Sequence, residues 1–198
     1  MTLRRLKSFS FGLALCCLCL FIAEITANSE PVQWPVNGHW YDAIGGSLTW
    51  IQAFQDARSR SYQDLPGHLA TLTSQGENDF VWQTFLQPDG YWLGGFQIRL
   101  AKKIDKGWMW ITRERWSFTN WSDYEPNDCC ETQGVEDGEE NSLHFLHGEG
   151  EWNDIPTDSE QPGYIIEYEQ RLEQSLAPIK LKDIHQLTTT WAKIKQAQ

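Results

Sequence analysis

The chain has 198 residues, 11 of them Trp, and a formal net charge of −11 at pH 7. This length predicts one domain with a short remainder, and the aromatic content suffices for a core of that size. A surface this acidic is a poor partner for nucleic acid or for an anionic membrane, so neither is expected as a target.

Residues 1–27 have the pattern of a secretory signal peptide. A basic start is followed by an apolar stretch from Phe9 to Ile22, and Ala27 is a suitable cleavage residue. The apolar stretch is shorter than the ~20 residues of a membrane span, which favours removal over an uncleaved anchor helix. We therefore predict a secreted or extracytoplasmic protein with no membrane span after cleavage, and a domain over residues 28–168.

The first half of this domain is predicted to contain two helices. Thr49 with Gln52, and Ser74 with Glu77, form capping-box patterns that open them. The first helical segment is expected to end at Pro66-Gly67 and the second helix to run through Phe85.

Short strands are predicted around these helices and after them. The first begins at residues 37–41 and turns at Gly45-Gly46, and further strands are expected at residues 68–72, 91–96, 108–111, 143–145 and 164–168. This order, with a long polar loop among antiparallel strands, predicts an α+β fold.

The region between Trp121 and Asp154 carries the candidate chemistry. It contains no Lys or Arg, and residues 123–160 include 13 Asp and Glu. So many carboxylates repel one another unless water or a cation collects them. Oxygen ligands without a His-Cys cage at zinc spacing suit Ca²⁺, which takes about 6–8 oxygens. The sequence therefore predicts a calcium site on loops, and a solvated acidic loop is the simpler alternative.

Three groups of oxygen ligands follow in order: Glu125-Pro126-Asn127, then Gly138-Glu139-Glu140, then Trp152-Asn153-Asp154. Their order and spacing resemble the C-type lectin-like domain family in its EPN variant. The resemblance implies one Ca²⁺ that also takes two neighbouring hydroxyls of a sugar. The implied metal ligands, which are also the implied carbohydrate-binding residues, are Glu125, Asn127, Glu139, Asn153 and Asp154.

The resemblance covers roughly Gln33 to Tyr168, through motifs such as NGHWY, GHLATL, NDFVW, YWLGGF, WSFTNW and GYIIEY. It implies a C-type lectin-like fold, with two helices packed on short antiparallel sheets and a long calcium-binding loop region. It also implies a cis Pro126 and, from the EPN order, glycans of the mannose, glucose, N-acetylglucosamine and fucose group. No enzymatic activity is expected.

Two departures from the family pattern affect stability and metal content. The four positions of the usual disulfides hold Tyr62, Asn141, Thr157 and Ile166, which resembles the cysteine-free bacterial branch. Each missing bridge would forgo about 2–4 kcal/mol, so the core and bound Ca²⁺ should matter more. Lys102 and Lys106 stand where auxiliary calcium sites have acids. A full second site is therefore not expected, whereas Asp128 and Glu140 are candidates for a weak one.

Other interpretations of the acidic region stay open. Glu125 and Glu139 would be a glycosidase pair if a cleft lay between them. His144 and His147 would bind zinc with Cys129-Cys130, but His residues three apart in a strand point to opposite faces. The main alternative keeps the fold and makes Ca²⁺ purely structural, with a protein or another surface as the ligand.

Several further expectations concern assembly and the end of the chain. Cys129-Cys130 forms a strained vicinal bridge, links two chains or stays reduced, and the sequence permits all three. Because one shallow sugar site binds weakly, a homo-oligomer with several sites is a hypothesis. Residues 169–198 are expected to be a disordered tail, with a weak amphipathic helix as the alternative. Trp121 and Trp152 are expected in the core rather than on a sugar.

Overall fold

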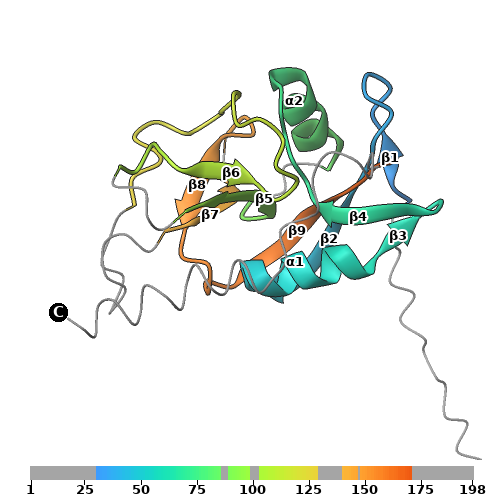
Figure 1. Cartoon of the computed structure of the whole chain (residues 1–198), viewed down its shortest axis with the longest axis horizontal. Coiled ribbons are helices and arrows are strands. Elements are labelled where there is room, and N and C mark those ends of the chain that lie inside the picture. The colour runs from blue at the N-terminus through green and yellow to red at the C-terminus, as the bar shows by residue number, and fades with distance from the viewer. Residues whose placement is uncertain (1–29, 86–88, 99–102, 129–139, 147, 171–198) are drawn as a thin grey trace, which may run out of the picture.

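The computed structural model describes residues 30–85, 89–98, 103–128, 140–146 and 148–170 (Figure 1). Within these ranges the elements are β1 (Val32–Gln33), β2 (Trp40–Leu48), α1 (Trp50–Ser59), β3 (Ser61–Tyr62), β4 (Leu65–Leu69), α2 (Gln75–Thr84), β5 (Trp92–Gln97), β6 (Trp108–Trp110), β7 (Ser142–Phe145), β8 (Trp152–Ile155) and β9 (Gln161–Tyr168). Two helices combined with short strands confirm the predicted α+β class.

The strands join in one sheet with the order β1-β2-β9-β5-β7-β8, in which β4 also pairs with β9 and β6 with β5. Strand β9 lies antiparallel to β2, from Trp40 opposite Tyr168 to Leu48 opposite Gln161. The beginning and the end of the domain are therefore neighbours. The pairing of β5 with β9 is parallel, and the other pairs are antiparallel. Figure 1 shows β6, β7 and β8 at one end of the molecule and β1, β3 and β4 at the other.

Helix α1 begins as its sequence signals predict, but it ends at Ser59, before the expected break at Pro66-Gly67. Gln52 donates its backbone N–H to Thr49 Oγ1, and Gln52 Oε1 accepts from the Thr49 N–H, so the capping box is complete. Positions at helical spacing form its buried face: Trp50, Ala53, Phe54 and Ala57.

Helix α2 departs from its predicted N-terminus. Ser74 accepts from the Glu77 N–H as expected, but the Glu77 carboxylate does not return to Ser74. It accepts instead from the N–H of Thr73 and contacts the hydroxyl of Tyr41. The second capping box is therefore half formed, because tertiary contacts take the Glu77 side chain. The helix ends at Thr84, with Phe85 as its C-cap.

Two predicted breaks lie inside strands. Strand β2 continues through Gly45-Gly46 to Leu48, because residues before and after the glycines pair with β9. The register of this pairing is irregular between Gly45 and Leu48. Pro66 and Gly67 lie within β4, where Pro66 sits opposite Ser61 of the short strand β3. A Cβ on Gly67 would lie 2.7 Å from the Ala57 carbonyl oxygen, so glycine permits β4 to approach the end of α1.

Tryptophan side chains dominate the hydrophobic cluster next to strands β6, β7 and β8. Trp152 is fully buried, and its ring centroid lies 5.7 Å from that of Trp110 and 5.9 Å from those of Trp116 and Trp121. Trp121 is partly buried against the same cluster. The structure therefore places Trp121 and Trp152 in core packing, as predicted.

Non-covalent contacts surround the four positions where the resemblance implies cysteines. Tyr62 packs its ring against Tyr168, in the hydrophobic cluster that includes Ile166. Asn141 is buried, and its neighbour Ser142 lies 2.8 Å from Thr157, hydroxyl to hydroxyl. Apolar and polar packing thus takes the place of covalent links in this domain.

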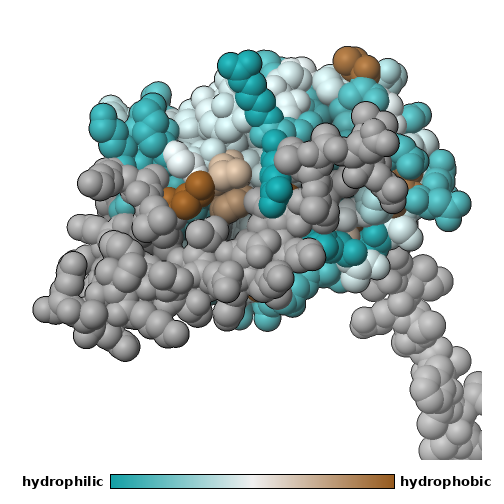
Figure 2. Space-filling view, viewed as in Figure 1, coloured by the Kyte–Doolittle hydropathy of each residue, from teal (hydrophilic) through white to brown (hydrophobic). Residues whose placement is uncertain are grey.

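The described surface is mostly polar. On the face in Figure 2 hydrophobic colour is confined to separate spots. The large apolar side chains that the described residues expose are Val32, Val36, Ile104 and Tyr124. No helix in the described part of the chain is long and apolar enough to cross a membrane.

Candidate metal and ligand site

The Asp154 side chain connects strand β8 to the EPN loop. Its carboxylate is 1% exposed and accepts hydrogen bonds from the backbone N–H groups of Asn127 and Asp128, each at 3.1 Å. Two backbone donors orient both carboxylate oxygens, so the loop at residues 125–128 is held against the strand. Two groups of predicted ligands, more than 20 residues apart in sequence, meet at this point.

The Glu125 carboxylate lies close enough to the Asp154 carboxylate to interact with it. The peptide bond between Glu125 and Pro126 is cis, as the resemblance implies. Glu125 Oε1 accepts from Asn127 Nδ2 at 2.8 Å. Glu125 Oε2 is buried and has no hydrogen-bond partner among the described residues. A buried carboxylate oxygen normally has a partner, so this atom is suited to a cation.

The electrostatics of this pair support the same conclusion. Burial, with a smaller contribution from Asp154, raises the pKa of Glu125 to about 7. Burial also raises the pKa of Asp154. Two partly desolvated carboxylates that face each other destabilise their common ionised state, and a divalent ion would remove that cost. The donor set is carboxylate and amide oxygen, which suits Ca²⁺.

Asn153 is the fourth predicted ligand among the described residues. It lies directly opposite His144 in the pairing of β7 with β8, and its Nδ2 is 3.0 Å from His144 Nε2. Glu139 and Cys129-Cys130 lie outside the described residues, as does His147. The structure therefore brings Glu125, Asn127 and Asp154 into contact and places Asn153 next to them in β8.

Asp128 and Glu140, the predicted weak second site, are also neighbours. The Glu140 N–H donates to Asp128 Oδ1 at 3.1 Å. This bond ties the EPN loop to the start of the segment that leads into β7. A second bound ion at this point stays a prediction.

A buried polar cluster at the opposite end of the domain was missed in the sequence. His39 Nδ1 lies 2.6 Å from Glu167 Oε1, and the Tyr41 hydroxyl lies 2.7 Å from Glu77 Oε1 and 3.0 Å from Glu167 Oε1. Both carboxylates are at most 3% exposed. Hydrogen bonding to Glu167 raises the pKa of His39, and burial raises that of Glu77. The available signal was Glu167 itself, a charged residue inside the apolar run of β9.

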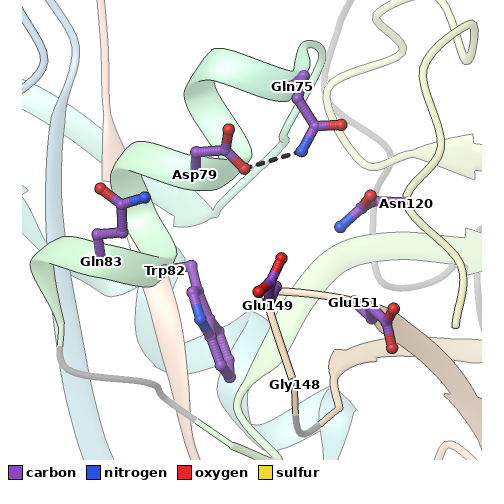
Figure 3. Close-up of a pocket in the computed structure, with 8 residues that line it drawn as sticks. All are labelled: Gln75, Asp79, Trp82, Gln83, Asn120, Gly148, Glu149 and Glu151. Carbon is purple, nitrogen blue, oxygen red and sulfur yellow. Dashed lines mark hydrogen bonds between the residues drawn. The ribbon is translucent and has the colours of Figure 1, made fainter.

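A separate polar hollow of about 490 Å³ lies between α2 and the loops at its side. Figure 3 shows its lining: Gln75, Asp79, Trp82, Gln83, Asn120, Gly148, Glu149 and Glu151. At the side of the hollow formed by α2, Gln75 Nε2 donates to Asp79 Oδ1 at 2.8 Å. None of the four predicted ligands among the described residues lines this hollow, so the candidate site is the loop surface around Glu125 and Asp154.

Comparison with known proteins identifies the family. The Lectin C-type domain profile matches residues 48–164. Human C-type lectin domain family 4 member G is 36% identical over 138 residues, which are 69% of this chain and 42% of that protein. Halomucin of Haloquadratum walsbyi is 31% identical over 152 residues, 73% of this chain but 2% of halomucin. This chain thus spans less than half the length of either relative, and it belongs to the C-type lectin domain family.

A solved structure supports the same assignment. The carbohydrate-recognition domain of cow CD23, crystallised in the presence of a GlcNAc2Man3 oligosaccharide, aligns with a TM-score of 0.53 at 25% identity. The alignment covers 67% of this chain and 89% of that domain. The C-type lectin fold predicted from the sequence is confirmed.

Proposed function

We propose that this protein binds carbohydrate through Ca²⁺, with mannose, glucose, N-acetylglucosamine and fucose as the preferred sugars. The ligands would be Glu125, Asn127, Glu139, Asn153 and Asp154. The observation that carries the proposal is the buried Glu125 Oε2, which lacks a donor among the described residues and faces the buried Asp154 carboxylate. The Glu-Pro-Asn order and the oligosaccharide present with cow CD23 support the sugar class.

Each residue has a distinct task in this proposal. Glu125 and Asp154 supply negative charge, and the backbone of Asn127 and Asp128 holds Asp154 in place. Asn127 and Asn153 would offer carbonyl oxygens to the ion and amide N–H groups to sugar hydroxyls. When bound, Ca²⁺ would supply a Lewis-acidic centre for two neighbouring hydroxyls. Binding of this kind involves no covalent chemistry, so we expect a lectin rather than an enzyme.

The setting of the protein is part of the proposal. We infer a secreted or extracytoplasmic lectin with its binding domain over residues 28–168, and several copies acting together on a glycan surface. Affinity for calcium is expected in the 10⁻⁴ to 10⁻³ M range of extracellular modules, roughly. Multivalent contact would then compensate for weak binding at each site.

The test is retention on immobilised mannose with calcium and elution by a chelator, combined with calorimetric titration of Ca²⁺. Asp154→Asn should abolish both retention and calcium binding, because it removes one of the charges that hold the ion. Asp123→Asn is the matched control, since it makes the same change at an exposed residue of the same loop. Calcium binding without retention of any sugar on a glycan array would refute the carbohydrate proposal and leave a structural ion.

A further inference from the structure

We propose that His144 is a positioning residue that holds the Asn153 amide in the orientation required for calcium and sugar binding. The inference rests on the proposed function and adds a residue that belongs to none of the three ligand motifs. It follows from a row of three side chains across strands β5, β7 and β8.

The register of the sheet creates this row. Strand β7 lies between β5 and β8, with Trp92 opposite His144 on one side and His144 opposite Asn153 on the other. Residues directly opposite in antiparallel strands project to the same face and lie close enough for their side chains to interact. Trp92, His144 and Asn153 therefore form a continuous side-chain contact that ends at the candidate site.

Trp92 is the fixed end of the row. It is fully buried, and its indole N–H donates to the Leu48 carbonyl oxygen at 2.7 Å. The His144 ring meets it edge to face, with 5.9 Å between the centroids and 72° between the ring planes. His144 itself is 5% exposed. Packing on Trp92 thus restricts rotation of the imidazole and directs it along the row toward Asn153.

The contact between His144 and Asn153 determines which way the amide faces. The Asn153 Nδ2 atom lies 3.0 Å from His144 Nε2. With the amide placed this way its nitrogen donates, so Nε2 accepts and the imidazole proton lies on Nδ1, a buried atom. One N–H of Asn153 is then committed to His144. Its Oδ1 remains as an acceptor for the ion, and its second N–H remains for a sugar hydroxyl.

Removing this acceptor would leave the amide without its orienting partner. Rotation by half a turn then exchanges Oδ1 and Nδ2, and an N–H group in place of an oxygen ligand repels a cation. Groups that orient metal ligands in this way typically change metal affinity about 10- to 100-fold when they are replaced.

Three variants test the role. His144→Met keeps a flexible side chain of similar bulk with only a weak sulfur acceptor in place of Nε2, and calcium affinity should fall about tenfold. His144→Gln restores an acceptor near the position of Nε2 and should recover most of the affinity. Ser142→Ala is the control: it lies two residues away on the same face of β7 and loses a bond to Thr157, so it should leave calcium affinity unchanged.

A second measurement does not depend on calcium. Nitrogen-15 NMR of the calcium-free protein should show His144 with its proton on Nδ1 and an unprotonated Nε2. A proton on Nε2 would overturn the inference, as would unchanged calcium affinity in His144→Met or equal losses in the Met and Gln variants. If the unsubstituted protein bound no calcium, the proposed function itself would fail, whereas normal binding with unaffected variants would reject the role of His144 alone.

Discussion

The buried polar cluster around Glu167 predicts an unusual pH dependence of stability. The variant His39→Asn should isolate the charge, because the Asn amide places a neutral donor near the position of Nδ1 while removing the titratable group. In the native protein Nδ1 lies 2.6 Å from Glu167 Oε1, and the side chain of His39 is 27% exposed. The variant therefore keeps a hydrogen bond to Glu167 and loses the positive charge.

The magnitude follows from the difference between the two kinds of bond. A hydrogen bond to a charged group contributes about 1.5–3 kcal/mol and a neutral one about 0.5–1.5 kcal/mol. Partial exposure of the imidazole screens the charge, so we expect a loss of about 1 kcal/mol at low pH. For a domain of this size that corresponds to roughly 3–5 °C in Tm.

The sign of the pH effect follows from the direction of the pKa shift. The pKa of His39 is raised in the folded protein, mainly by its hydrogen bond to Glu167. Its contribution is fully present below the unfolded pKa of about 6.5 and is lost as pH rises through the raised folded value. The two proteins should therefore differ in Tm near pH 6 and converge near pH 9.

The assay is thermal unfolding followed by tryptophan fluorescence in a chelator, at both pH values. Asn37→Ala provides a control in the same cluster, because it removes a neutral amide that donates to Glu77 at 2.9 Å. Its cost should change little with pH. A difference between wild type and His39→Asn that is the same at pH 6 and pH 9 would refute the reasoning.

Three further predictions concern the loops and the sheet. Tyr124 is 95% exposed and has a φ of 73°, so Tyr124→Gly should raise the free energy of unfolding by about 1 kcal/mol in a urea titration. Glu125→Gln should raise the Tm of the calcium-free protein by relieving the repulsion with Asp154, and should abolish the rise in Tm that millimolar calcium causes in the native protein. Gly67→Ala should lower the free energy of unfolding by about 1–3 kcal/mol, because its Cβ would overlap the Ala57 backbone; an unchanged unfolding midpoint would show that β4 shifts freely.

The local signals in the sequence predicted the helices well and some strand limits poorly. The capping box of Thr49 and Gln52 forms because both partners lie within one turn and have no competing contact. The Glu77 carboxylate accepts instead from the distant Tyr41 hydroxyl and from the backbone of Thr73, so it does not return to Ser74. Glycine and proline predict breaks at positions 45–46 and 66–67, but pairing with other strands continues the extended backbone there.

For the candidate site, too, the sequence predicted some features and the structure added others. Motif order in the sequence predicted Glu125, Asn127, Asn153 and Asp154 as ligands, and the cis peptide bond before Pro126 agrees with the family pattern. Glu139 stays a prediction, because it lies outside the described residues. The hydrogen bonds from the loop backbone to Asp154, the buried Glu125 oxygen and the contact of His144 with Asn153 were not visible in the sequence.

The sequence by itself determined the family and the α+β class and predicted the oxygen ligands, because each depends on residue types at short, ordered spacings. Only the tertiary structure decided which side chains hold those ligands in place and where charge is buried. The reason is that register across β5, β7 and β8, and the pairing of β2 with β9, bring together residues that are far apart in the chain. Burial and hydrogen bonding arise only after that pairing, and they determine the charge state and orientation of each group.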